Sequence, residues 1–163
     1  MPSTRQLGGP KIRVHLKIDT GMGRSGVWVD DAVPFVEAVF GMRNLEVEGI
    51  MTHLAAADDP QDDDYTRQQM AAFQGLLDEL ERRGYAFRYV HAANTAALVR
   101  FPETHLNMVR LGLGIYGMYP SETLRSLIHL EQVITFYTKI SQIKEHPPGR
   151  SISYNRRFMT ERP

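Results

Sequence analysis

Strand-like and helix-like patterns alternate along most of this chain, and that order restricts its fold more than any other feature. Period-2 and apolar patterns predict strands at 12–18, 45–52, 86–91 and 107–110. Helical spacing of apolar residues predicts helices at 30–42, 66–83 and 94–100. The helix at 66–83 has the clearest pattern, and Gly84 is expected to end it. Strands that alternate with helices in this way are typical of a parallel β/α architecture.

The first predicted strand has two chemically different faces. Val14, Leu16 and Ile18 alternate with a polar set made of Arg13, His15, Lys17 and Asp19. Because successive side chains of a strand point to opposite faces, one face is apolar and the other is charged. This pattern suits a barrel wall that helices cover on the outside and that faces a polar site on the inside.

Two glycine-containing segments follow predicted strands and place an arginine beside each strand end. After the first strand, Gly21 and Gly23 permit backbone angles closed to other residues and carry Arg24 back over the strand. After the last predicted strand, Arg110 precedes a run with glycine at 112, 114 and 117. Loops at strand ends commonly carry the binding residues of parallel β/α proteins.

Composition excludes several classes of partner. The 163 residues are 42% hydrophobic and 23% charged, with a formal net charge of zero, so nothing in the charge indicates binding to nucleic acid or to an anionic membrane. The sequence contains no cysteine, which fits a cytoplasmic location. No signal peptide or apolar run of membrane-spanning length is visible. We therefore expect a cytoplasmic protein whose partners are small molecules or protein.

Five blocks of the sequence resemble the alanine racemase family in order and spacing. They are Val14 to Arg24, Gly49 to Asp59, His91 to Ala97, Val109 to Ser121 and, more weakly, Ser151 to Tyr154. The resemblance implies a partial (β/α)8 TIM-type barrel of about four β/α units followed by the beginning of an all-β domain. It also implies the second half of a pyridoxal phosphate (PLP) binding barrel at 11–125 and a truncated start of the C-terminal β domain at 126–163. Residues 1–10, which precede the first predicted strand, are expected to be an unstructured leader.

The resemblance implies PLP-dependent interconversion of L-alanine and D-alanine, which supplies D-alanine for peptidoglycan. The family attaches PLP through a lysine in a Lys-Ala-x-Ala-Tyr-Gly stretch, and none of Lys11, Lys17, Lys139 and Lys144 has that context. The family's catalytic tyrosine also has no counterpart in these residues. We therefore assign no catalytic residue and expect the chain to be inactive alone.

Four residues near the last predicted strand match family positions that hold PLP. By resemblance, Arg110 faces the pyridine nitrogen, and a permanently charged guanidinium keeps that nitrogen unprotonated. Gly112 and Leu113 match backbone positions at the phosphate, and Thr95 is expected to add a hydroxyl. A structural arginine and a plain turn with a helix cap are the alternatives for these residues.

The remaining site residues lie at the ends of earlier strands. Arg24 resembles the arginine at the phenolic oxygen of PLP, and Lys17 resembles a lysine that is carbamylated in many members and holds that arginine. His53 resembles the histidine that packs against the cofactor ring, and Asn94 is expected to orient it or another neighbour. His91 is expected to line the site. No residue is assigned to a resident metal ion.

Two other functions are compatible with these residues. A metal-dependent barrel hydrolase would use carbamylated Lys17 with His53 and His91 as ligands. A non-catalytic module would bind PLP or a partner subunit. Because half a barrel leaves parallel strand edges open, we also expect dimerisation, aggregation or a flattened open sheet in solution, with a homodimer as the expected partner state.

Overall fold

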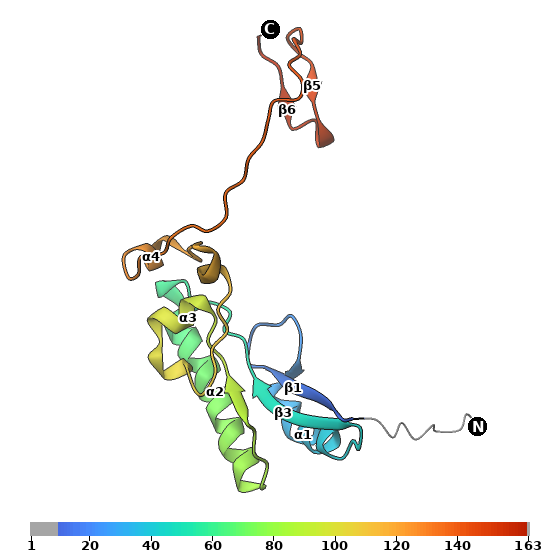
Figure 1. The fold of residues 1–163 in the computed structure, drawn as a ribbon, viewed down its shortest axis with the longest axis vertical. Helices are drawn as coiled ribbons and strands as arrows, with labels where there is room; N and C mark the ends of the chain where they lie inside the picture. The colour runs from blue at the N-terminus through green and yellow to red at the C-terminus, as the bar shows by residue number, and fades with distance from the viewer. Residues whose placement is uncertain (1–9, 163) are drawn as a thin grey trace, which may run out of the picture.

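The computed structural model describes residues 10–162, so nearly all of the expected leader lies outside the described residues. Its main sheet contains four parallel strands in the order β2-β1-β3-β4. These strands are β1 (Ile12–Asp19), β2 (Val27–Trp28), β3 (Leu45–Met51) and β4 (Tyr89–His91). Figure 1 shows the helices lying against this sheet and the chain continuing into a separate hairpin. The predicted parallel α/β architecture and partial barrel are confirmed.

The predicted helices are present with small shifts in their ends. The longer ones are α1 (Ala32–Phe40), which follows the 3-10 turn η1 (Val29–Asp31), and α2 (Asp63–Arg82), which follows η2 (Pro60–Asp62). The short ones are α3 (Thr95–Arg100), η3 (Pro102–Thr104), η4 (Leu113–Tyr116) and α4 (Glu122–Arg125). At the end of α2, Gly84 has a φ of 86°, a left-handed conformation that favours glycine and ends the helix.

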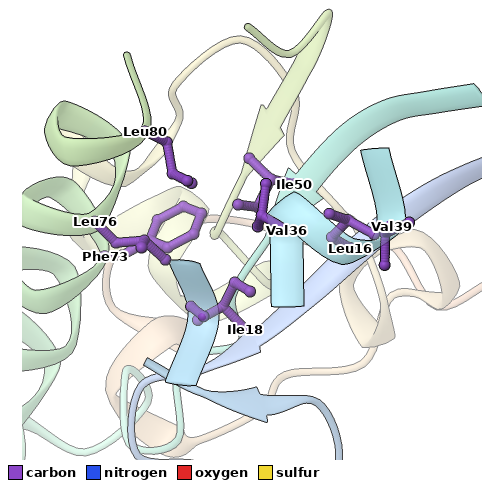
Figure 2. Close-up of a cluster of buried hydrophobic side chains, with 9 residues drawn as sticks. Leu16, Ile18, Val36, Val39, Ile50, Phe73, Leu76 and Leu80 are labelled. Carbon is purple, nitrogen blue, oxygen red and sulfur yellow. The ribbon is translucent and has the colours of Figure 1, made fainter. Parts of the chain in front are cut away.

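The main core lies between the sheet and helices α1 and α2 (Figure 2). It joins strand residues to helix residues, namely Leu16, Ile18, Val36, Val39, Ile50, Phe73, Leu76 and Leu80. The apolar face of β1 is therefore the face that the helices cover, as its alternation predicts. Arg13, His15 and Lys17 consequently project from the opposite face of the sheet.

The strand predicted at 107–110 is wrong. Among the described residues, this segment makes only an isolated bridge between Met108 and His91. Two backbone hydrogen bonds accompany this bridge, from the Asn107 N–H to the Val90 carbonyl at 3.4 Å and from the Arg110 N–H to the Ala93 carbonyl at 3.0 Å. The Asn107 side chain adds two more: its Oδ1 accepts from the Val90 N–H at 2.7 Å, and its Nδ2 donates to the Arg88 carbonyl at 3.0 Å. The fourth parallel strand is instead β2, which the period-2 pattern does not indicate because it contains only two residues.

A second, smaller core supports the loops at the carboxyl ends of β3 and β4. It is made largely of small side chains and contains Leu54, Ala57, Ala93, Ala96, Ala97, Phe101 and Leu124. An ion pair fastens α3 to α2: Arg100 Nη2 donates to Asp63 Oδ1 at 2.6 Å, and Arg100 Nη1 donates to the Ala57 carbonyl at 2.7 Å. These contacts hold the loop after β3 against α3.

The segment from 129 to 147 has no helix or strand, although its β-branched and aromatic residues suit a strand. Most of its apolar side chains are exposed, with Tyr137 at 91%, and no neighbouring strand pairs with it among residues 10–162. The chain then forms a short antiparallel hairpin of β5 (Ser151–Ile152) and β6 (Phe158–Met159), joined through η5 (Tyr154–Arg156). No helix within 10–162 has both the length and the apolar character of a membrane span.

Candidate cofactor-binding site

A cavity of about 340 Å³ opens where β3 and β4 end and the loop after Met108 begins. Six of the predicted site residues line it, and they are His53, Asn94, Thr95, Arg110, Gly112 and Leu113. These residues come from three loops separated by up to about 60 positions in the chain. The carboxyl ends of parallel strands meet at one edge of the sheet, which brings the loops together.

Groups at the ends of β3 and β4 hold the guanidinium of Arg110. Its Nη2 donates to the Thr52 carbonyl at 3.0 Å and to the Ala92 carbonyl at 2.9 Å, and it approaches His53 Nδ1 at 3.2 Å. Its Nη1 donates to His91 Nδ1 at 2.8 Å. Burial lowers the pKa of Arg110 from its ordinary value, but a guanidinium surrounded by acceptors stays protonated at neutral pH. Its Nε–H donates to no acceptor in the described part of the chain.

His53 and His91 both lie against the guanidinium of Arg110. His91 Nδ1 accepts from the Nη1 N–H, and a nitrogen that accepts a hydrogen bond carries no proton. His53 Nδ1 lies 3.2 Å from Nη2, whose two N–H groups face the Thr52 and Ala92 carbonyls. Burial lowers the pKa of His53, and the charges of Arg110, Arg24 and Lys17 lower it further. Burial and then the charge of Arg110 lower the pKa of His91 to about 4. At neutral pH neither ring adds a second positive charge beside Arg110.

Asn94 and Thr95 organise the turn that carries Gly112. Asn94 caps α3, because its Oδ1 accepts from the Ala97 N–H at 3.0 Å while its Nδ2 donates to the Leu54 carbonyl at 3.2 Å. Thr95 Oγ1 accepts from the N–H groups of Gly112 and Gly114 at 3.0 and 3.3 Å. A Cβ at Gly114 would lie 2.7 Å from Thr95 Cγ2, so the close approach requires glycine there.

The loop after β1 carries Arg24, and hydrogen bonds to the Asp19 side chain stabilise it. Burial opposes the charged form of Asp19, but hydrogen bonds from the Gly21, Gly23 and Met22 N–H groups outweigh it, so its pKa is lowered. Lys17 Nζ donates to Ser25 Oγ at 2.6 Å. Arg24 is exposed, and in the described part of the chain no hydrogen bond joins it to Lys17.

Gln69 is a site-building residue that the sequence analysis missed. It lies on α2, is 1% exposed, accepts from the Ala55 N–H at 2.9 Å through Oε1, and donates to the His53 carbonyl at 3.2 Å through Nε2. It thereby fixes the backbone on both sides of Leu54. The available signal was its spacing four residues before Phe73, which puts a polar side chain on the buried face of the helix.

The geometry argues against the metal-dependent hydrolase. The guanidinium of Arg110 occupies the position between His53 and His91, where a metal ion would have to bind both rings. The second nitrogen of His91 is engaged by His15 at 2.7 Å. Residues 10–162 contain no group of three or more histidine, aspartate or glutamate side chains arranged to hold a metal ion.

The chain is similar to known proteins over most of its length. The family model described as alanine racemase, N-terminal domain, matches residues 2–120. Alanine racemase 1 of Oceanobacillus iheyensis is 39% identical over 151 residues, and the alanine racemase of Carboxydothermus hydrogenoformans is 42% identical over 149. These matches cover 93% and 91% of this chain, respectively, but the chain spans only 40% of the length of each relative.

Solved structures give the same result. The crystal structure of alanine racemase from Bacillus anthracis with bound L-Ala-P is 34% identical and superimposes with a TM-score of 0.78. That match covers 96% of this chain and 41% of the Bacillus anthracis chain. The fold, the matched residues and the identities agree, and this chain belongs to the alanine racemase family through its N-terminal domain.

Proposed function

We propose that this chain forms part of the PLP pocket of an alanine racemase, an enzyme that interconverts L-alanine and D-alanine and supplies D-alanine for peptidoglycan. The observation that carries the proposal is the arrangement of Arg110, which the Thr52 and Ala92 carbonyls and His91 Nδ1 hold at the edge of the cavity, while its Nε–H donates to no acceptor among residues 10–162. A fixed guanidinium donor with an available N–H suits a ring nitrogen that must remain unprotonated.

The residues around the cavity fit the chemical groups of PLP. Thr95 accepts two backbone N–H bonds and so keeps its own hydroxyl proton, which can be donated to a phosphate oxygen. The Leu113 N–H begins η4 and has no partner within that turn, so it is a second donor. A volume of about 340 Å³ is within the range of small-molecule sites.

When bound, PLP withdraws electrons from the substrate and makes its α-proton removable. The residues of this chain hold and tune that group. Arg110 would donate to the ring nitrogen without releasing its proton, which would weaken the electron sink and favour return of the proton to the same carbon. His53 would pack beside the ring, Asn94 would hold the strand-end loop next to it, and Arg24 is proposed to contact the phenolic oxygen. Carbamylated Lys17 is proposed to pair with Arg24.

The names of the relatives support alanine as the substrate. All the relatives described above are called alanine racemase, and the Bacillus anthracis enzyme was solved with L-Ala-P. We propose the same substrate, a homodimer and a cytoplasmic location for this protein. The proposed division is a barrel portion at 11–125 and the start of a β domain at 126–163. The non-catalytic PLP-binding module is the second candidate, because the 163 residues contain no Lys-Ala-x-Ala-Tyr-Gly stretch.

A PLP titration of the purified chain, followed by absorbance, tests the proposal. We expect saturable binding that Arg110→Ala weakens by at least about tenfold, which corresponds to the loss of one charged hydrogen bond. Arg43→Ala is the matched control, because Arg43 is exposed and precedes β3, whereas the cavity lies where β3 ends. Absence of saturable binding, or equal loss in both variants, would overturn the proposal.

A further inference from the structure

We propose that His91, His15 and Glu48 form a positioning chain behind Arg110 that orients its guanidinium toward the cavity. The inference rests on the proposed function only where it concerns PLP. The chain itself is a property of the inner face of the sheet. None of these three residues touches the cavity, so they act through Arg110 and not on a ligand.

The contacts form a continuous line across three strands. Arg110 Nη1 lies 2.8 Å from His91 Nδ1, and His91 Nε2 lies 2.7 Å from His15 Nδ1. His15 Nε2 then faces Glu48 Oε2 at 3.9 Å. His91 is 2% exposed, so water does not compete for its two nitrogens. Each ring nitrogen of the two histidines therefore has an assigned neighbour.

The donor character of arginine sets the direction of every bond in this line. A guanidinium has no acceptor, so His91 Nδ1 must accept from Arg110 and the proton of the neutral ring must lie on Nε2. That proton is donated to His15 Nδ1, which puts the His15 proton on Nε2, pointing toward the Glu48 carboxylate. A proton on His15 Nδ1 would place two N–H donors against each other, because His91 Nε2 lies 2.7 Å away and carries a proton. The line thus has one hydrogen-bonding pattern.

The far end of the line is anchored by ion pairs. Glu48 Oε1 lies 3.3 Å from Arg13 Nη1 and 3.4 Å from Arg88 Nη1, and the Glu48 side chain is only 14% exposed. These contacts fix the Glu48 side chain in place. The groups that face the two rings are Arg110 at one end and Glu48 with its arginine partners at the other, and Tyr89 stacks on His15 at 5.7 Å.

The backbone of β3 makes room for this line. The register of β1 against β3 shifts between Val14 and His15, so that His15 lies opposite Gly49. A Cβ at Gly49 would lie 2.8 Å from the His15 ring and 2.8 Å from the Tyr89 carbonyl. The irregularity and the glycine together leave room for the His15 imidazole beside Gly49 and Tyr89.

The first test uses ¹H–¹⁵N NMR of the histidine ring N–H groups in the chain without PLP. We expect His91 to carry its proton on Nε2, with a low-field resonance that exchanges slowly with water. His15→Leu removes the acceptor and should move that resonance upfield and speed its exchange, whereas His15→Asn places an amide oxygen near the lost Nδ1 and should restore it. A proton on His91 Nδ1, or no response to His15→Leu, would overturn the proposal.

The second test measures PLP affinity in the same variants. We expect His15→Leu to weaken binding about tenfold and His15→Asn to stay within about threefold of the parent chain. Glu48→Gln should weaken binding less than His15→Leu, and Glu46→Gln on the same strand is the control because Glu46 is exposed. Equal affinity in His15→Leu and His15→Asn would overturn the positioning role. If the parent chain binds no PLP, the proposed function fails, while the NMR result still decides whether the line exists.

Discussion

The guanidinium of Arg110 donates to His91 Nδ1 at 2.8 Å, which makes a permanently charged residue and a titratable residue depend on each other. The bond exists only while His91 is neutral, because a protonated ring would present a second donor and a second positive charge. This relationship gives the site a dependence on pH that neither residue would show alone.

We predict that the chain loses stability as the pH falls from about 6.5 to about 4. The folded His91 has a pKa of about 4, below its ordinary value of 6.5, so over this interval the unfolded chain binds a proton that the folded chain does not. The contribution to the free energy of unfolding is complete above pH 6.5 and falls by up to about 3 kcal/mol by pH 4. Urea denaturation at several pH values measures it. His91→Gln should reduce the slope, whereas exposed His129→Gln should leave it unchanged; equal slopes would contradict the prediction.

Substitution of Gly49 is expected to destabilise the protein. The added Cβ of Gly49→Ala would lie 2.8 Å from the His15 ring, and relief requires the strand or the ring to shift, at a cost of about 1–3 kcal/mol. Gly75→Ala is the matched control, because nothing lies within 4 Å of its added Cβ and it is in the middle of α2. That control should gain about 0.5–1 kcal/mol from helix propensity. Urea midpoints that move together in both variants would show that the contact at Gly49 is unimportant.

Gln69→Leu is expected to destabilise the loop that carries His53, although Gln69 does not line the cavity. It leaves the Ala55 N–H and the His53 carbonyl without their buried partner, which costs about 1–3 kcal/mol. PLP affinity should fall with stability, because the backbone that carries His53 is released. The control is Gln74→Leu, since Gln74 is exposed and bonds only to Asp78 in the same helix. An unchanged urea midpoint for Gln69→Leu would contradict the assignment.

We predict no racemisation by a protein made of these 163 residues supplemented with PLP. The residues that this chain contributes hold and orient the cofactor, and no lysine has the context that attaches it in the family. The measurement is conversion of D-alanine to L-alanine by the purified protein. Turnover above that of free PLP, with loss in Arg110→Ala, would disprove the prediction. Restoration by a fragment that carries the Lys-Ala-x-Ala-Tyr-Gly lysine would support it.

We predict self-association that increases with concentration. In the described residues β1 has β2 beside it only at Ile18 and Asp19, and most apolar side chains of the segment 129–147 are exposed. Open strand edges and apolar surfaces of this kind bind other chains. Sedimentation velocity should show dimers or larger species. Replacing Phe136, Tyr137 and Ile140 together by serine should shift the population toward monomer, and the control is Lys139→Ser with Lys144→Ser. A monomer at all concentrations would contradict the prediction.

The parts of the fold that follow from local pattern were predicted correctly. The alternation in β1 identified which face the helices cover, since Leu16 and Ile18 are buried and Lys17 is not. The spacing in α2 predicted its length to within three residues at each end. The strand at 107–110 was predicted wrongly: the segment lies beside β4 but makes only an isolated bridge with it, and the Asn107 side chain bonds to Val90 N–H and the Arg88 carbonyl, contacts that no local pattern reveals.

The candidate site also contains residues that local sequence pattern predicts and residues that it does not. Sequence blocks predicted six residues that the structure brings around one cavity, and Arg110 was among them. Gln69, His15 and Glu48 were not predicted as part of the site. Their roles depend on contacts between elements that are distant in sequence, such as the 2.7 Å contact between His15 and His91 across 76 positions.

The sequence by itself determined the order of strands and helices, the polar inner face of β1 and the family to which the chain belongs, because periodicity and motif spacing are written in consecutive residues. Only the tertiary structure decided how Arg110 is held, which tautomer His91 adopts and why β3 has glycine at position 49. Those properties depend on distances between separate strands, and a shift of one residue in strand register would change every one of them.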